Sequence, residues 1–303
     1  GRLTRLEDTM PKTLINICGS ERSGSTMLDL ILGNDPEAFS CGEIYALYRP
    51  WRKHHFRPVC GCGEECEYLR EFQKTREGRF QNLLFETFGF SWVVDSSKDL
   101  NWVIDNQDWV TRDRGRVLNL VIWKQPNSFC VSFLKRGKAS DYWRKVFINY
   151  YQRFLDTELP FVSICYDDFV RQPEESLQQL CRLVGMDYFP DKLNFWEKTH
   201  HQVFGSGGTA RQVQTGRSEI FQQDENSGRF AQQIKQVEAK LADDSAVNAI
   251  ISTLRSRQLS LNGKNDPTLF NSSRCGKKTS WYYRQEAINQ EKRQRYGGRR
   301  FDG

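Results

Sequence analysis

The sequence lacks any long hydrophobic run, and this absence excludes a bilayer-spanning segment. No apolar stretch among its 303 residues approaches the roughly 20 residues that cross a membrane. The N-terminal segment Gly1–Lys12 is polar and has no apolar stretch of the kind found in signal peptides. We therefore expect no membrane span in this chain and a cytoplasmic location.

Outside its C-terminal end, the sequence has no excess of charge of either sign. The net charge is +6, and residues 274–303 carry nine Lys and Arg against three Asp and Glu, an excess that equals the whole net charge. A basic end can hold an anionic polymer, but it is more often a solvated tail. We predict a solvated tail over 263–303 and no nucleic-acid partner.

Strand and helix signals alternate along the first two-thirds of the chain, and no internal repeat is present. Short β-branched and apolar runs predict buried strands, and apolar residues at helical spacing predict helices. The predicted strands are Thr13–Cys18, Ser91–Asp95, Val117–Trp123 and Phe161–Cys165. The predicted helices are Ser25–Leu32, Pro126–Arg136, Asp141–Asp156, Pro173–Val184 and Gly228–Gln258. Such alternation implies a parallel sheet with right-handed crossovers.

The segment Gly19–Thr26 has the frame of a phosphate-binding loop between a strand and a helix. Main-chain N–H groups of such a turn, with the positive end of the following helix, attract an anion without needing side chains. An NTPase loop requires Lys directly after the second glycine, but Ser25 stands there and the cation is Arg22. The loop therefore predicts an anionic nucleotide and disfavours magnesium–ATP chemistry.

The run Arg22-Ser-Gly-Ser-Thr26 resembles the loop of sulfotransferases that use 3′-phosphoadenosine 5′-phosphosulfate (PAPS), in the style of their carbohydrate, tyrosylprotein and bacterial branches. The resemblance implies that Arg22, Ser23, Gly24, Ser25 and Thr26 bind the 5′-phosphosulfate. It also implies an α/β, single P-loop-like three-layer domain, with a central parallel sheet flanked by helices. The predicted boundaries are 1–12 for a polar N-terminal segment, 13–217 for the α/β domain, 218–262 for a helical extension of that domain and 263–303 for the basic tail.

Three further matches to this family concern the nucleotide. Lys124 and Ser132 stand at the eight-residue interval of the Arg and Ser that bind the 3′-phosphate in the family. A lysine still pairs with phosphate but lacks the bidentate fork of arginine, for which Arg136 would compensate. Tyr166 matches a tyrosine near the adenine, and Arg211 ends a glycine-containing segment near the nucleotide or acceptor.

The implied reaction moves a sulfuryl group from PAPS to a hydroxyl of a carbohydrate, a protein tyrosine or a small molecule, and it requires no metal. The resemblance implies Glu43 as the base that takes the acceptor proton. His200 or His201 is the second candidate, because histidine transfers protons near neutral pH. Lys98 follows a predicted strand, and we expect it to neutralise charge on the leaving phosphate together with Arg22.

Two other functions fit parts of the sequence. A degenerate P-loop kinase or NTPase would use magnesium and a carboxylate at a strand end, for which Asp95 is available. A non-catalytic anion- or nucleic-acid-binding module would use the basic tail. The resemblance to carbohydrate branches makes the Golgi lumen the alternative location.

Seven of the nine cysteines fall into two kinds. Cys18, Cys130, Cys165 and Cys181 lie among apolar residues and are predicted to be buried. The other kind is a tight group, formed by Cys60, Cys62 and Cys66. For that group a metal site, a disulfide and free thiols all remain open, and a metal would need a fourth ligand such as Cys41, His54 or His55.

Overall fold

A computed structural model describes residues 12–205, 225–259, 267–270 and 276–297. Its centre is a five-stranded sheet in the order β2-β3-β1-β4-β5, in which every pair of neighbours is parallel. The strands are β1 (Thr13–Cys18), β2 (Ala38–Ser40), β3 (Trp92–Asp95), β4 (Arg116–Trp123) and β5 (Val162–Cys165). The expected α/β class with a parallel central sheet is confirmed.

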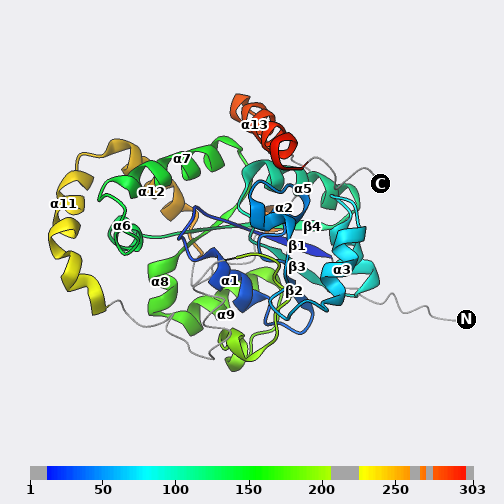
Figure 1. The fold of residues 1–303 in the computed structure, drawn as a ribbon. Coiled ribbons are helices and arrows are strands. Elements are labelled where there is room, and N and C mark those ends of the chain that lie inside the picture. The colour runs from blue at the N-terminus through cyan, green and yellow to red at the C-terminus, as the bar shows by residue number, and fades with distance from the viewer. Residues whose placement is uncertain (1–11, 206–224, 260–266, 271–275, 298–303) are drawn as a thin grey trace, which may run out of the picture.

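α-Helices, 3₁₀-helices and a π-helix surround the sheet (Figure 1). The α-helices are α1 (Ser25–Leu32), α2 (Tyr45–Tyr48), α3 (Glu67–Lys74), α4 (Phe80–Asn82), α5 (Leu100–Arg112), α6 (Pro126–Leu134), α7 (Tyr142–Asp156), α8 (Tyr166–Arg171), α9 (Pro173–Val184), α11 (Ala231–Leu241), α12 (Ser245–Ser256) and α13 (Ser280–Gly297). The 3₁₀-helices are η1 (Lys53–Phe56), η3 (Pro190–Leu193), η4 (Phe195–Glu197), η5 (Glu225–Phe230) and η6 (Pro267–Phe270), and η2 (Leu83–Thr87) is a π-helix.

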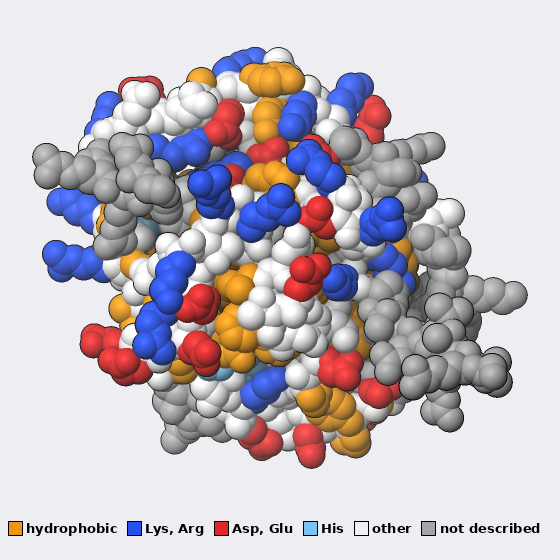
Figure 2. Space-filling model, turned by 90° about the vertical axis from the view of Figure 1, so that its right-hand side faces the viewer, with side chains coloured by type: hydrophobic (Ala, Val, Ile, Leu, Met, Phe, Trp, Pro, Cys, Tyr) orange, Lys and Arg blue, Asp and Glu red, His pale blue; other side chains and the backbone are white. Residues whose placement is uncertain are grey.

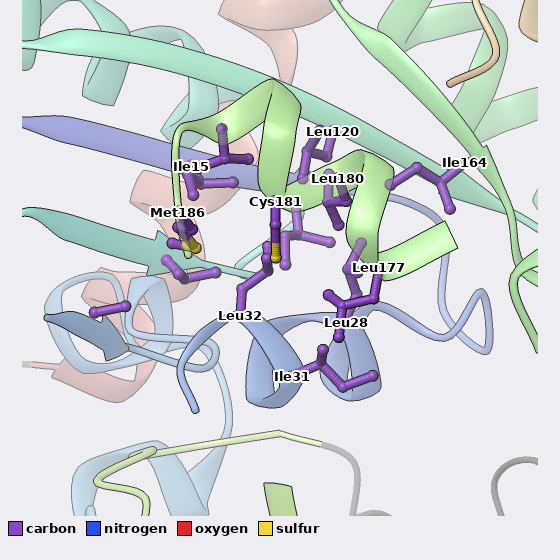
Figure 3. Close-up of a cluster of buried hydrophobic side chains, with 14 of the residues drawn as sticks. Ile15, Leu28, Ile31, Leu32, Leu120, Ile164, Leu177, Leu180, Cys181 and Met186 are labelled. Atoms are coloured by element: carbon purple, nitrogen blue, oxygen red, sulfur yellow. The ribbon is translucent and has the colours of Figure 1, made fainter. Parts of the chain in front are cut away.

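The core lies in two apolar layers, one on each side of the sheet. Helices α1, α8 and α9 cover one face, and α5, α6, α7 and α12 cover the other (Figure 1). Figure 3 shows Leu28 and Leu32 of α1 beside Leu177 and Leu180 of α9, over Ile15 of the sheet. Burying a leucine of this kind contributes about 1.5–3 kcal/mol. Because both faces are covered, β1 is buried along its whole length, as its continuous apolar run predicts.

The predicted elements differ from the structure mainly at the edges. The edge strand β2 is three residues long and carried no recognisable strand pattern. The single helix predicted over Gly228–Gln258 is two helices, because Asp244 accepts a hydrogen bond from the Val247 amide (3.3 Å) and starts α12. Helix α6 ends at Leu134 rather than Arg136.

Part of the predicted solvated tail is a helix that packs on the domain. The Tyr282 hydroxyl of α13 donates to Asp105 Oδ1 (2.7 Å), and Asn101 Nδ2 of α5 donates to the Tyr282 carbonyl (3.0 Å). Tyr282 is buried, so aromatic burial outweighs the solvation of the neighbouring charges. The expectation of a solvated tail therefore does not hold for the face of α13 that carries the buried Tyr282 and Asn289.

Charged side chains of both signs are intermingled on the face shown in Figure 2. Among the described residues on that face, Lys and Arg side chains lie beside Asp and Glu side chains over most of the coloured surface. Within the described ranges, no helix has both the length and the apolar character needed to cross a membrane.

Candidate functional site

All five strands of the sheet end at the same edge, and a predicted site residue follows each of them. Arg22 follows β1, Glu43 follows β2, Lys98 follows β3, Lys124 follows β4 and Tyr166 begins directly after β5. Parallel strands place their carboxyl ends together, which is where open α/β sheets bind ligands. The fold thus gathers residues from five separate sequence segments along one edge.

The glycine loop needs its two glycines because other atoms approach the backbone too closely for side chains. Gly24 has φ 102°, and a Cβ there would lie 2.3 Å from Cδ2 of Tyr166. A Cβ at Gly19 would lie 2.5 Å from the Ser23 hydroxyl oxygen and 2.6 Å from the Ile122 carbonyl. Both positions therefore require glycine for steric reasons, and Gly24 also for its left-handed backbone.

Two tyrosine hydroxyls of α7 brace the start of this loop. The Tyr150 hydroxyl accepts from the Gly19 amide (2.9 Å) and donates to the Lys98 carbonyl (2.9 Å). The Tyr151 hydroxyl donates to the Ile122 carbonyl (2.8 Å). The aromatic spacing of α7 predicted core packing, but it did not reveal this role. The available signal is that a buried tyrosine hydroxyl needs a partner.

The loop contains polar atoms that suit an anion. Among the described residues, Arg22 Nε and Ser23 Oγ are buried without a hydrogen-bond partner. Burial, and after it the charge of Arg136, lowers the pKa of the Arg22 guanidinium. An anion bound between the two guanidiniums would relieve this repulsion and satisfy the buried donors. The loop therefore fits a phosphate or phosphosulfate group.

A lysine from the neighbouring strand reaches the position where the loop has none. Lys98 Nζ donates to Ser25 Oγ (3.3 Å) and to Glu43 Oε1 (2.5 Å). The side chain of Lys98 is 17% exposed and that of Glu43 is 33% exposed, so the pair is partly shielded from water. Lys98 has φ 67°, a left-handed conformation that is uncommon outside glycine. Lys98 therefore places an ammonium group beside the loop, although the loop sequence itself contains no lysine.

The residues predicted for the 3′-phosphate also lie together. Lys124 Nζ donates to Ser132 Oγ (3.3 Å) and lies 4.1 Å from the centre of the Tyr166 ring. Pro126 starts α6 immediately after the strand, so the eight-residue interval places Ser132 within reach of Lys124. Tyr166 in turn packs on Gly24 and connects this group to the loop.

Two buried carboxyl groups lie beneath the site. Burial raises the pKa of Asp29 to about 7, and its Oδ2 accepts from the Ser96 hydroxyl (2.5 Å). Burial also raises the pKa of Asp95, whose oxygens accept from the Ser97 amide (2.8 Å) and the Trp102 indole (2.7 Å). Asn106 donates to the same Asp95 oxygen as Trp102 (3.0 Å), so this carboxyl group is engaged inside the protein.

Within the described part of the chain, neither His200 nor His201 forms a hydrogen bond with Lys98 or Glu43. His200 is buried, its Nε2 lies 2.7 Å from the Phe195 carbonyl, and burial lowers its pKa to about 4. His201 instead lies among Cys60, Cys62 and Cys66. The fourth member of that group is therefore His201, not Cys41, His54 or His55. The role of His201 as a base stays a prediction, and Arg211 lies outside the described residues.

A cavity of about 310 Å³ adjoins the start of the loop. It is lined by Ser20 and Glu21 of the loop and by Tyr142, Lys145, Val146, Asn149 and Tyr150 of α7.

Comparisons with known proteins add little to this geometry. Neither a protein-family model nor a curated protein matches the sequence. One similar solved structure is the sulfotransferase domain of the Synechococcus PCC 7002 olefin synthase (14% identity, TM-score 0.42), matched over 89% of this chain and 96% of that one. Another is the sulfotransferase domain from the curacin biosynthetic pathway (16% identity, TM-score 0.39), matched over 77% and 98%. Scores of this size carry no argument about function, which must come from the site itself.

Proposed function

We propose that this protein transfers a sulfuryl group from PAPS to a hydroxyl acceptor. The supporting observation is that Lys98 contacts both Glu43 and Ser25. A carboxylate base, a cation and an anion-binding loop therefore meet at one point. Transfer from an anionic donor to a hydroxyl needs these three groups, because catalysis rests on positioning, charge stabilisation and removal of the acceptor proton.

Each residue of the edge has a distinct task in this proposal. Arg22 and the amides of Ser23–Thr26 bind the 5′ end of the nucleotide, and Lys124 with Ser132 binds its 3′-phosphate. The donor supplies an activated sulfuryl group with a phosphate leaving group. Glu43 takes the proton of the acceptor hydroxyl, and Lys98 stabilises the negative charge that develops on the leaving oxygen.

The structure bears on the kinase alternative in two opposite ways. Lys98 brings an ammonium to Ser25, so the absence of a loop lysine no longer disfavours triphosphate binding by itself. However, magnesium–ATP chemistry needs a carboxylate free to face the metal, and Asp95 is buried and accepts three hydrogen bonds from groups inside the protein. This engagement favours the metal-independent donor.

The nucleic-acid-binding alternative depends on a free basic tail. Helix α13 packs on α5, and its Arg293 pairs with Glu286 within the helix. Because this helix packs on the domain and Arg293 is paired within it, we propose that the partner is a hydroxyl acceptor rather than a nucleic acid.

Thermal unfolding with two ligands tests the proposal. We expect 3′-phosphoadenosine 5′-phosphate (PAP) without metal to stabilise the protein, by about 2.7 kcal/mol at a hundred times its Kd. We expect ATP with magnesium to stabilise it much less. The reverse order would overturn the proposal. A screen of labelled PAPS against sugars, tyrosine peptides and lipids then identifies the acceptor class.

A further inference from the structure

Four metal-ligating side chains meet beside the site although no step of the proposed reaction uses them. The ligand atoms of Cys60, Cys62, Cys66 and His201 all lie within 4.8 Å of one another. Three come from the loop that follows η1, and the fourth comes from the segment that follows η4. The fold therefore brings together groups that are 135 to 141 residues apart.

The distances match a tetrahedral metal more closely than any bond among the side chains. Zinc bonds of about 2.3 Å to sulfur and about 2.0 Å to nitrogen imply, at tetrahedral angles, separations of roughly 3.8 Å between sulfurs and roughly 3.5 Å between sulfur and nitrogen. His201 Nδ1 lies 3.6 Å from Cys66 Sγ and 3.9 Å from Cys60 Sγ, and the sulfurs of Cys60 and Cys62 are 3.3 Å apart.

A disulfide explains this arrangement less well. All the cysteines in the described ranges are free. A disulfide would join two of the three sulfurs and give the imidazole no reason to face the group. The separation of Cys60 and Cys62 is also far above the roughly 2.05 Å of an S–S bond.

Backbone hydrogen bonds hold the cysteine loop in its conformation and tie it to the segment that carries His201. The Leu69 amide donates to Cys66 Sγ (3.5 Å), which stabilises negative charge on that sulfur. The Gly63 amide donates to the Cys60 carbonyl (3.0 Å), and Gly63 has φ 121°, so the chain can reverse between the first two cysteines and the third. The Gly61 amide donates to the Gln202 carbonyl (3.0 Å) and ties the cysteine loop to the residue after His201.

We propose that Cys60, Cys62, Cys66 and His201 bind one structural Zn²⁺ ion. Three thiols lose their protons to solvent, three Zn–S bonds form, and neutral His201 adds a bond from Nδ1, so the site carries one net negative charge. Sulfur-rich tetrahedral ligands suit zinc, and four protein ligands leave no open position for a substrate. The ion is therefore separate from the transfer reaction, for which we still predict no metal requirement.

The zinc site positions the turn that carries Glu43. Phe204, three residues after His201, accepts at its carbonyl from the Glu43 amide (3.2 Å). Gln202 Nε2 donates to Ser40 Oγ at the end of β2 (2.9 Å). A Cβ at Gly42 would lie 2.4 Å from the Phe204 carbonyl, so the two segments are in close contact. Only this link to Glu43 rests on the proposed function, whereas zinc binding does not.

Metal analysis of the purified protein tests the proposal without an activity assay. We expect one zinc per chain by elemental analysis. We also expect a visible spectrum typical of tetrahedral thiolate-rich Co²⁺ after replacement by cobalt. Cys62→Ser, at the exposed cysteine, and His201→Asn should each lower the zinc content at least several-fold. Cys41→Ser and His54→Asn, which change the other candidate ligands, should leave it at one.

Several results would overturn the proposal. Folded wild-type protein that stays free of zinc after dialysis against the ion, or a disulfide found among the three cysteines by mass spectrometry, would do so. Full zinc content with an unchanged cobalt spectrum in His201→Asn would remove His201 from the site. If the variants do not fold, the cobalt spectrum of the wild-type protein decides alone: octahedral or thiolate-free cobalt contradicts the assignment.

Discussion

The ammonium group of Lys98 lies 2.5 Å from the carboxylate of Glu43, 55 residues earlier in the chain. This ion pair follows β3 and β2, two adjacent strands, and it touches the glycine loop through Ser25. The contact with Lys98 holds the Glu43 carboxylate beside the glycine loop, which is where a proton acceptor for this proposal must lie.

We predict that Glu43→Gln lowers turnover about 10²-fold or more, because the amide keeps the shape but cannot accept the proton. PAP affinity should change little, because Glu43 does not bind the nucleotide. Turnover with labelled PAPS and calorimetric binding of PAP measure the two effects. Glu71→Gln, at a partly exposed position of α3 whose carboxylate pairs with Lys74, is the control. Turnover near the wild-type value would exclude Glu43 as the base.

Lys124→Ala should weaken PAP binding by roughly 10- to 100-fold, the value of one charge-assisted hydrogen bond. The reason is that Lys124, held against Ser132 and the Tyr166 ring, supplies the charge for the 3′-phosphate. Lys124→Arg should retain affinity, and Lys138→Ala should have no effect. Unchanged affinity of the Ala variant in a binding titration would remove Lys124 from the 3′ site.

The Asp29 carboxyl group should contribute a loss of stability as the pH rises from about 4 to about 7, opposite in sign to the contribution of His200, whose pKa burial lowers to about 4. Burial raises the pKa of Asp29 from 3.8 to about 7, so in this range the folded protein holds a proton that the unfolded chain has released. The loss is at most about 1.4 kcal/mol per pH unit. Urea denaturation at several pH values measures it. Asp29→Asn should remove this contribution, so that stability changes more positively with pH than in the wild-type protein, and an identical slope in the variant would contradict the raised pKa.

Tyr282→Phe should destabilise the protein by about 1.5–3 kcal/mol, because the change removes a hydrogen bond to the charged Asp105. Tyr283, its neighbour on α13, is 62% exposed, so Tyr283→Phe should be neutral. Chemical denaturation of both variants makes the comparison. Equal stabilities would mean that α13 does not pack as described.

The predictions that came from short segments agreed best with the structure. The strand–glycine turn–helix unit at Gly19–Thr26 and the Lys124–Ser132 interval each lie within one local unit, where backbone periodicity and turn chemistry act over a few residues. Both were therefore visible in the sequence. Strand β2 was not visible, because three residues at a sheet edge leave too little periodic signal.

The sequence alone determined the α/β alternation, the glycine loop between β1 and α1 and the identity of most residues at the strand ends. Only the tertiary structure decided that Lys98 reaches Ser25, that Tyr150 supports Gly19 and that His201 completes the cysteine group. Apolar burial drives the sheet together without encoding which polar groups become neighbours. These contacts depend on strand order, a property of the whole chain that no single segment contains.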